Sequence, residues 1–402
     1  MKVAIGVHSQ NLDFPSGMLS YYQQLIKYLP LRDPSTEYVV FCGNEDVEYY
    51  RRKAPQMQVV GTGWANRYRI RRLFTENALL PLALKNEKVD VLYHTGSVAP
   101  LWVPSQIRMA VAIFAVQHLT PGQITPVQQL YRSLLFEPCL RRAEVRVVNS
   151  EYTKSIIEAK FPNVKSRIEV IPHGIDETLF HPAPVTKQER EILRRIGIDR
   201  PYILFVGKVY PYKKLQVLVE AFCRQVKAHN LPHQLVVLGA FADSYGSGEN
   251  GRAQILRMVE EAGLANRLIM KDFIRITGLR TLYAAADVYV QTSAAETFGK
   301  TVVEAMACGC PVLAARAAAT PEVLGDAGMY YETDDATMCG NLLVRLLGDA
   351  ALRRQLSEAG LERARRYSFI AEVDQLAALF HRLYESASPS PSIHGPAGRW
   401  NA

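Results

Sequence analysis

The chain alternates short apolar runs with longer amphipathic stretches. In the first half the apolar runs are KVAIGVH, YVVFCG, MQVVGTG, VDVLYH, RMAVAIFAV and VRVVNS. Short, continuously apolar runs are typical of strands that are buried on both faces of a parallel sheet. Amphipathic segments between them, such as 20–29 and 75–86, predict helices. This order of elements predicts an α/β fold with a doubly wound parallel sheet.

The pattern starts again in the second half. The runs YILFVGK, QLVVLGA, RLIMKD, ADVYVQTS, PVLAAR and GMYYE predict a second set of strands, with helices at 214–229 and 251–262 between them. The segment HPAPVTKQERE reads as a charged, proline-containing linker. A chain of 402 residues suits two hydrophobic cores better than one. We therefore predict two Rossmann-like domains.

The domain boundaries follow from these two series. We predict an N-terminal Rossmann-like domain at 1–180 and a C-terminal Rossmann-like domain at 181–368. A final amphipathic helix, at about 369–385, is expected to pack back on the first domain. The tail at 386–402 is rich in Ser, Pro and Gly and is predicted to be disordered.

Composition narrows the class of protein. The apolar runs are too short to cross a bilayer, and the N-terminus enters a strand pattern without a signal-peptide pattern, so a cytoplasmic location is expected. Of the six cysteines, Cys308 and Cys310 form a C-x-C pair that no second pair completes as a zinc set. We expect buried free thiols, no metal site and no cofactor.

Basic residues cluster locally, and one of these clusters contains aromatic residues. The net charge is +8, and Trp64, Arg67, Arg69, Arg71 and Arg72 lie close together. An acidic membrane surface or a phosphorylated acceptor would suit such a patch, which predicts a location peripheral to the membrane. The alternative is a solvated helix face. Nucleic acid is not an expected partner, because no nucleic-acid-binding motif accompanies the charge.

The strongest chemical signal is the segment ETFGKTVVE at 296–304. It follows the strand pattern ADVYVQTS, and a helix is expected to begin near Phe298 or Gly299. The free N–H groups of a first helical turn favour an anion, and Lys300 adds positive charge. Glu296, on the loop, can accept hydrogen bonds from sugar hydroxyls, whereas Glu304 shares a helix face with Lys300 and can hold a ribose diol.

A second signal comes from VGKVYPYKK. A strand pattern ends at Gly207, and Lys208 and Lys213 follow before the next helix. Two cations at the carboxyl end of a strand can neutralise a diphosphate leaving group. Both lysines are expected at the same sheet edge as Glu296, because ligands of open α/β sheets bind at this edge.

Together with VIPHGID, VNSEYTKSII, LYAAADVYV and ATPEVLGDAG, these motifs resemble the retaining glycosyltransferases of family 4. Those enzymes have the GT-B fold, in which two Rossmann-like domains face each other across a cleft. The resemblance covers nearly the whole chain. It implies a hexosyltransferase that uses a nucleoside diphosphate sugar and retains the configuration at the anomeric carbon. It also implies that the domain at 1–180 binds the acceptor and that the domain at 181–368 binds the nucleotide sugar. No D-x-D metal motif is present, so we expect metal-independent transfer.

The resemblance also implies roles for individual residues. Lys208 and Lys213 correspond to a basic pair on the donor diphosphate, Glu296 to a glutamate on the donor sugar and Glu304 to a ribose-binding glutamate. The segment Phe298, Gly299, Lys300 and Thr301 corresponds to residues along the sugar and diphosphate, and Gly17 to a glycine loop near the donor phosphates.

The chain departs from the family pattern at two positions that matter for catalysis. Lys208 stands where the family usually has Arg, so a bidentate phosphate contact becomes a point charge. The active-site histidine slot falls at Gln117-His118. We favour His118 as the catalytic histidine, with Gln117 as the alternative occupant.

The acceptor remains open between two main hypotheses. The first is a glycan, lipid-linked or polysaccharide acceptor of the kind used in bacterial envelope or exopolysaccharide synthesis, which the basic stretch favours. The second is a small soluble acceptor, such as a sugar phosphate, a polyol or a natural product. A non-catalytic sugar-nucleotide binding protein or an epimerase is a third, weaker hypothesis, because the glutamates and lysines are all present. The sequence does not choose between UDP, GDP and ADP as the donor nucleotide.

Overall fold

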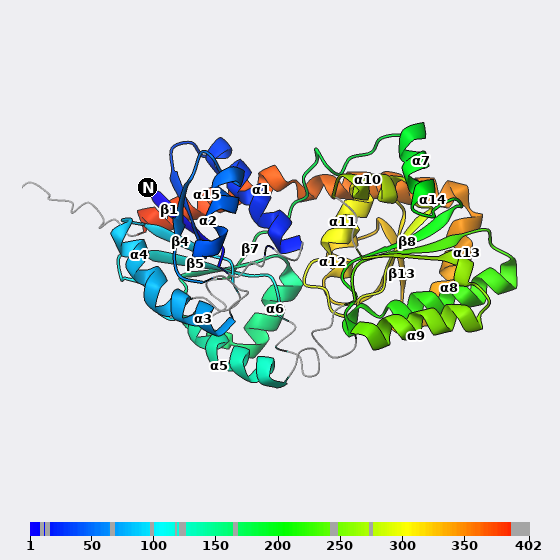
Figure 1. Ribbon diagram of the computed structural model, residues 1–402, viewed down its shortest axis with the longest axis horizontal. Coiled ribbons are helices and arrows are strands. Elements are labelled where there is room, and N and C mark those ends of the chain that lie inside the picture. Colours follow the sequence, from blue (N-terminus) through cyan, green and yellow to red (C-terminus); the bar gives the residue numbers. More distant parts are fainter. Residues whose placement is uncertain are drawn as a thin grey trace, which may run out of the picture. The chain divides into compact units, whose positions relative to one another are not determined.

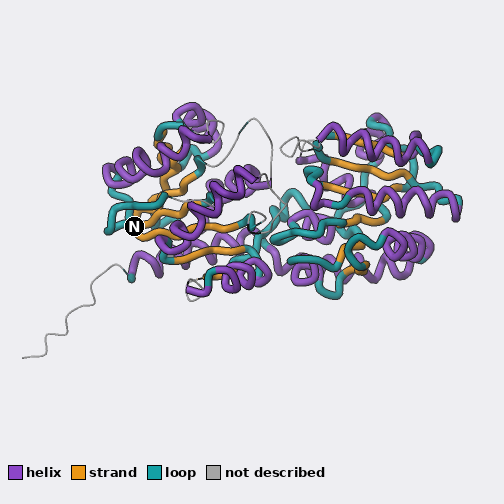
Figure 2. The backbone as a smooth tube through the Cα atoms, turned by 90° about the horizontal axis from the view of Figure 1, so that it is seen from below, coloured by secondary structure: helices purple, strands orange, loops and turns teal. Residues whose placement is uncertain are grey.

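The computed structural model describes residues 1–8, 12, 17–64, 69–96, 100–116, 119, 126–163, 168–241, 248–272 and 276–386. Two parallel sheets organise these residues, and in each of them the strands lie between helices (Figures 1 and 2). The predicted α/β class with two doubly wound sheets is therefore confirmed. The predicted disordered tail lies outside the described residues from 387 onward.

The first sheet has seven strands in the order β3-β2-β1-β4-β5-β6-β7. Its strands are β1 (Lys2–Gly6), β2 (Glu37–Cys42), β3 (Gln58–Gly61), β4 (Val91–His94), β5 (Arg108–Ile113), β6 (Val145–Val148) and β7 (Ile168–Val170). Its helices are α1 (Gly17–Arg32), α2 (Val47–Lys53), α3 (Arg69–Phe74), α4 (Leu80–Asn86), α5 (Pro126–Arg142) and α6 (Glu151–Lys160). The central strand β1 is almost entirely buried, as its continuous apolar sequence predicts.

The second sheet has six strands in the order β10-β9-β8-β11-β12-β13. Its strands are β8 (Tyr202–Val206), β9 (Gln234–Leu238), β10 (Leu268–Lys271), β11 (Val288–Gln291), β12 (Val312–Ala315) and β13 (Gly328–Tyr331). The helices of this half are α7 (Lys187–Arg195), α8 (Leu215–His229), α9 (Gly248–Glu261), α10 (Ile276–Ala285), α11 (Lys300–Ala307), α12 (Thr320–Leu324), α13 (Ala336–Gly348) and α14 (Ala350–Ala364), and the last helix of the chain is α15 (Phe369–Glu385). Buried apolar side chains cover both faces of this sheet.

Residue contacts divide the chain into two compact units. The first contains Met1–Ala112, Cys139–Arg146 and the chain from Val373 onward, and the second contains Ile113–Pro138 and Val147–Glu372. Most of α15 thus belongs to the first unit. There Arg32 forms a two-pronged ion pair with Asp374, and the Phe380 ring packs against Tyr93 at a centroid distance of 5.4 Å.

Three local predictions need correction. Residues 181–191 are not entirely a linker, because α7 begins at Lys187, where Thr186 and Glu189 form a reciprocal capping box. The helix expected at 75–86 is present, but its first five residues, Thr75–Leu79, form a π-helical turn (the π-turn) that leads directly into α4. The helix of the ETFGK segment begins at Lys300, since Gly299 adopts a φ of 94° as its N-cap.

Candidate active site

The order of the second sheet reverses between β8 and β11, which are neighbouring parallel strands. In open α/β sheets, ligands bind beyond the carboxyl ends of the strands at such a switch point. The segments that follow β8 and β11 carry Lys208, Lys213 and Glu296. The topology therefore brings the sequence-predicted lysines and the loop glutamate to one sheet edge.

Lys213 and Glu296 are in direct contact, since the Lys213 Nζ forms an ion pair with the Glu296 Oε1. Both side chains are largely buried, with 11% and 15% of their surface exposed. Two further bonds tie the segments together: the Ala294 N–H donates to the Tyr212 carbonyl at 2.9 Å, and the Thr292 hydroxyl donates to the Lys213 carbonyl. This pair presents a cation and a carboxylate side by side.

Lys208 has a different environment from Lys213. It is exposed, and its Nζ lies 5.5 Å from the centre of the Tyr210 ring. The turn that carries it needs glycine at two places, since a Cβ on Gly239 would lie 2.0 Å from the Gly207 carbonyl oxygen. Gly207 and Gly239 also have φ values of 144° and 149°, which favour glycine. Lys208 thus has an exposed charge on a main chain whose conformation is fixed by two glycines.

The loop before α11 buries the side chain of one predicted site residue, Phe298. The Phe298 side chain is only 3% exposed and belongs to the hydrophobic core, so this residue can meet a ligand only through its main chain. Gly299 then turns the chain into α11, and the Thr301 hydroxyl accepts a hydrogen bond from the Tyr289 hydroxyl at 2.8 Å. The first main-chain bonds of α11 are those that Val302 and Val303 donate to the Gly299 carbonyl oxygen. The N–H groups of Lys300 and Thr301 come before these bonds and can bind an anion.

Glu304 is buried under this loop, with 8% of its surface exposed. Burial raises the pKa of its carboxyl above the usual value, while the charge of Lys300 and a hydrogen bond from the Tyr283 hydroxyl at 3.0 Å act in the opposite direction. Tyr283 was not predicted as a site residue, although it lies in the motif LYAAADVYV. A buried carboxylate with one fixed donor can accept further hydrogen bonds from a ligand diol.

Some predicted site residues lie elsewhere or outside the described part. Gln117 and His118 are outside it. Gly17 is the exposed first residue of α1 and belongs to the other unit, where a Cβ added to it would meet no described atom within 4 Å. Within the second unit, the described site candidates are therefore the two lysines, the two glutamates and residues 298–301.

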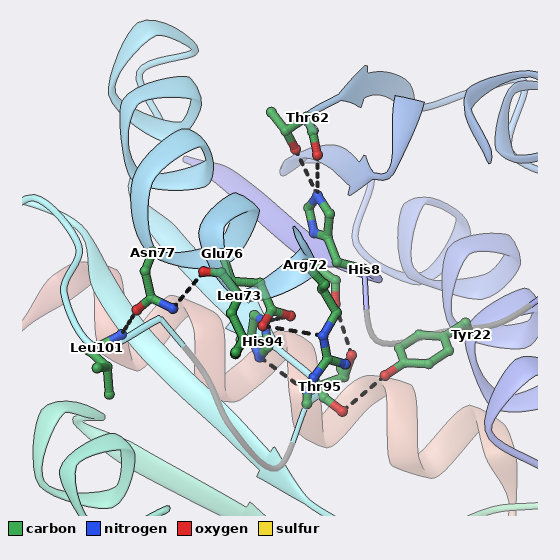
Figure 3. Close-up of polar contacts among 12 residues, drawn as sticks. His8, Tyr22, Thr62, Arg72, Leu73, Glu76, Asn77, His94, Thr95 and Leu101 are labelled. Atoms are coloured by element: carbon green, nitrogen blue, oxygen red, sulfur yellow. Dashed lines mark hydrogen bonds and ion pairs between the residues drawn. The ribbon is translucent and has the colours of Figure 1, made fainter. Parts of the chain in front are cut away.

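The first sheet carries a polar cluster that sequence reasoning missed, at its own switch point between β1 and β4 (Figure 3). Glu76, in the π-turn, is 1% exposed, and its carboxylate lies 3.6 Å from the Arg72 Nε and 3.4 Å from the His94 Nε2. His8 is fully buried and contacts the Thr62 hydroxyl at 2.7 Å. His8 follows β1 and His94 ends β4, and these positions at strand ends were the signal that the sequence offered. Their burial beside a glutamate depends on the π-turn, which the sequence did not indicate.

Charges within this cluster influence one another. Burial lowers the pKa of His8 to about 4. Burial also acts to raise the pKa of Glu76, but the neighbouring Arg72 and His94 outweigh it and hold that pKa below its usual value. The cluster is thus an internal network of neutral and charged groups rather than a solvated surface.

The cluster corrects the reading of the basic stretch as one continuous patch. Arg72 points inward to Glu76 with only 14% of its side chain exposed. Arg71 is exposed, and its guanidinium lies 5.7 Å from the centre of the Trp64 ring. Arg67 and the Arg69 side chain lie outside what the structure describes. The two neighbouring arginines face different sides because the helix turns by about 100° per residue.

The described residues contain free cysteines and no grouping of side chains that could hold a metal ion. All six cysteines are free and buried, including Cys308 and Cys310, as predicted. Within the described ranges, no cluster of three or more His, Cys, Asp or Glu side chains has a metal-binding arrangement. The same residues include no helix with the length and apolar character needed to span a bilayer.

Solved structures with the same architecture define the class of protein. Sucrose-phosphate synthase from Thermosynechococcus elongatus matches with a TM-score of 0.78 and 21% identity, over 96% of this chain and 99% of that one. Anabaena HepE in complex with UDP and glucose matches with a TM-score of 0.75 and 17% identity, over 95% and 100% of the two chains. The protein has the GT-B fold of glycosyltransferases.

Sequence comparisons identify the family. Residues 15–179 match the description "Glycosyltransferase Family 4", and residues 188–363 match "Glycosyl transferases group 1". The chain therefore belongs to family 4 of the glycosyltransferases, as its motifs predicted.

Curated relatives include D-inositol 3-phosphate glycosyltransferases. The protein of that name from Corynebacterium urealyticum is 28% identical over 276 residues, which are 67% of this chain and 64% of the relative. The one from Xylanimonas cellulosilytica is 32% identical over 234 residues, 55% of this chain and 52% of the relative. The matches thus span less than two thirds of the length of these relatives.

Proposed function

We propose that the protein is a retaining glycosyltransferase that moves a sugar from a nucleoside diphosphate sugar to a hydroxyl of a small phosphorylated acceptor, a sugar phosphate or a polyol phosphate. The observation that carries the donor half is the buried Lys213–Glu296 pair at the switch point of the second sheet. The acceptor half is supported by the relatives named for D-inositol 3-phosphate.

The donor is proposed to lie along the loop that leads into α11. Glu304 accepts hydrogen bonds from the ribose hydroxyls, and Glu296 accepts them from the sugar. Lys208, Lys213 and the first-turn N–H groups of α11 face the diphosphate. UDP is the first donor nucleotide to test, because the fold neighbour HepE was crystallised with it.

The reaction breaks the bond between the anomeric carbon and the diphosphate oxygen and forms a bond from that carbon to the acceptor oxygen. The acceptor hydroxyl loses its proton to the departing phosphate oxygen, which becomes part of the nucleoside diphosphate product. Negative charge grows on that oxygen as the bond breaks, and preorganised cations and N–H dipoles stabilise it. We propose that these protein groups balance the leaving charge without a resident metal.

This proposal has a direct test. A thermal-shift panel of UDP-, GDP- and ADP-sugars identifies the donor, because a ligand that binds only the folded state stabilises it. The selected donor is then incubated with sugar phosphates, polyol phosphates and their unphosphorylated counterparts. The products are identified by mass spectrometry, and their anomeric configuration is determined by NMR. We expect transfer to a phosphorylated acceptor with retained anomeric configuration. Turnover with unphosphorylated acceptors alone would contradict the acceptor class.

A second candidate, a lipid-linked acceptor, is favoured by exposed apolar side chains in the first unit. Phe74 is 56% exposed and Trp102 is 47% exposed, with the Trp102 indole N–H donating to the Asn77 carbonyl at 2.8 Å. Exposed aromatic residues near arginine suit the interface of an anionic bilayer. Co-sedimentation with phosphatidylglycerol vesicles, compared with phosphatidylcholine vesicles, distinguishes this candidate from the first.

A further inference from the structure

The main chain of the donor loop is held by polar side chains at the N-terminus of α6. The Ser150 hydroxyl donates to the Thr297 carbonyl oxygen at 2.6 Å, and the Thr153 hydroxyl lies 3.3 Å from the same oxygen. Ser150 and Thr153 are completely buried, and Thr297 is 8% exposed. All three residues belong to the second unit. Their bonds link positions 147 and 144 residues apart in sequence.

The Thr297 side chain is held as firmly as its carbonyl. Its hydroxyl donates to the Phe114 carbonyl oxygen at 2.9 Å, and the Asn149 amide lies 3.5 Å from the same hydroxyl. Asn149 is itself 2% exposed. Thr297 therefore has its side chain and its main chain fixed by different partners, although it contributes no charge to the site.

The N-terminus of α6 is also fixed against α12, which follows the donor loop and α11 in the chain. The two oxygens of the Glu322 carboxylate accept the N–H groups of Glu151 and Tyr152 at 2.8 and 3.0 Å. The Ala319 N–H donates to the Glu296 carbonyl oxygen at 3.1 Å. A carboxylate on the first N–H groups of a helix is a favourable charge-assisted contact. The donor loop is thus held from α6 and from the segment before α12.

The direction of a carbonyl determines the direction of the next N–H group. A trans peptide is planar, so its C=O and N–H point in opposite directions, and the described chain contains no cis peptide. With the Thr297 oxygen turned toward Ser150, the Phe298 N–H points away from α6. The Phe298 side chain cannot adjust, because it is packed edge-to-face against His173 and Tyr367 at 5.6 and 5.5 Å.

We propose that Ser150 and Thr153 are positioning residues for donor binding, which act by holding the Thr297 carbonyl so that the Phe298 N–H and the start of α11 face the donor diphosphate. This inference rests on the proposed function, since it assigns the direction of groups in the proposed donor site. Neither residue touches the donor. Their hydroxyls keep the anion-binding N–H groups in place before the ligand arrives, which avoids the cost of ordering them on binding.

The test compares ligands that differ only in the β-phosphate. Wild type is titrated calorimetrically with UDP, GDP and ADP, and the tightest of these is compared with its own monophosphate. Ser150→Ala is expected to bind the diphosphate about tenfold more weakly and the monophosphate within twofold of wild type. Turnover with the corresponding sugar donor should fall about tenfold to a hundredfold in kcat. Ser150→Thr, which keeps a hydroxyl, should restore both values.

Loss of a helix cap needs a separate control, since the Ser150 hydroxyl also accepts the Thr153 N–H at 3.0 Å. Thr186→Ala removes the cap of α7 by the same chemistry and should leave both affinities unchanged. If Ser150→Ala does not fold, Thr153→Val provides the second test and should show the same selective loss of diphosphate affinity.

Diphosphate affinity and kcat within twofold of wild type in the folded variants would overturn the proposal, as would an equal loss of monophosphate and diphosphate affinity. A wild-type protein that binds no nucleotide and transfers no sugar would instead overturn the proposed function itself. The two failures are therefore distinguishable.

Discussion

Lys213 and Glu296, which lie 83 residues apart in the sequence, form a largely buried ion pair at the edge of the second sheet. Removal of one partner from such a pair leaves the other charge uncompensated in a poorly solvated place. Without a donor, the Lys213 ammonium and the Glu296 carboxylate thus neutralise each other's charge. With a donor, the lysine can turn to the diphosphate and the carboxylate to the sugar hydroxyls.

The adjacent lysines 213 and 214 form a matched pair for mutation. Lys213→Gln should lower kcat/KM for the sugar donor about a hundredfold to a thousandfold, because a preorganised cation at the leaving group is lost. Lys214 pairs instead with Asp334 at the surface, where both side chains are partly exposed, so Lys214→Gln should stay within about threefold of wild type. Steady-state rates with varied donor concentration measure both. Equal effects of the two substitutions would contradict the site assignment.

Replacement of Glu304 by Gln should weaken nucleotide binding but leave the stability of the ligand-free protein unchanged or raise it. Its raised folded-state pKa means that the folded protein is most favoured below the ordinary carboxyl pKa and loses part of that stability as the pH rises toward the raised value. Glu304→Gln removes this cost, so the ligand-free variant should unfold at the same temperature as wild type or higher at pH 7.5. Nucleotide affinity should fall about tenfold or more, since a ribose acceptor is lost.

Thermal unfolding with and without the nucleotide diphosphate measures both effects in one experiment. Glu296→Gln is the comparison variant, because it should keep nucleotide affinity closer to wild type while losing turnover. A Glu304→Gln protein that binds nucleotide as wild type does would remove this residue from the site.

Arg71 and Arg72 should differ sharply in their effect on stability. Arg72→Gln removes the cation beside the buried Glu76 carboxylate and should cost about 3 kcal/mol in the free energy of unfolding. Arg71→Gln changes an exposed side chain over Trp64 and should cost less than about 0.5 kcal/mol. Urea unfolding followed by fluorescence and circular dichroism gives both values. A small loss for both variants would show that the Glu76 network contributes little to stability.

His8 predicts a specific sensitivity to acid. Its pKa of about 4 in the folded protein lies below the ordinary histidine value of 6.5 because the ring is buried. The unfolded chain therefore takes up a proton first as the pH falls below 6.5, and the folded state loses stability down to about pH 4. The total loss from this one group is about 3 kcal/mol.

Variants separate His8 from the other histidines. His8→Gln should flatten the fall in unfolding free energy between pH 6.5 and 4, whereas His381→Gln, at a partly exposed site beside Asp33, should leave most of it in place. Urea titrations at half-unit pH intervals provide the measurement. An unchanged pH profile in His8→Gln would mean that another group causes the acid sensitivity.

Local sequence determined much of the fold. Runs such as YVVFCG and YILFVGK became the buried strands β2 and β8 because a strand buried on both faces needs apolar residues at every position. The strand–turn–helix context of ETFGK was equally local, since Gly299 supplies a positive φ that an L side chain rarely adopts. Only the first residue of the helix was misplaced.

Tertiary structure decided which side chains meet. The spacing of Lys213 and Glu296 is unrelated to any helical or strand period, and their contact exists because β8 and β11 are neighbours in the sheet. The inward direction of Arg72 required the π-turn that carries Glu76, and the role of Ser150 required α6 to lie against the donor loop. Sequence periodicity reports which face of an element is buried, but long-range pairing depends on how whole elements pack, and that is settled only by the folded chain.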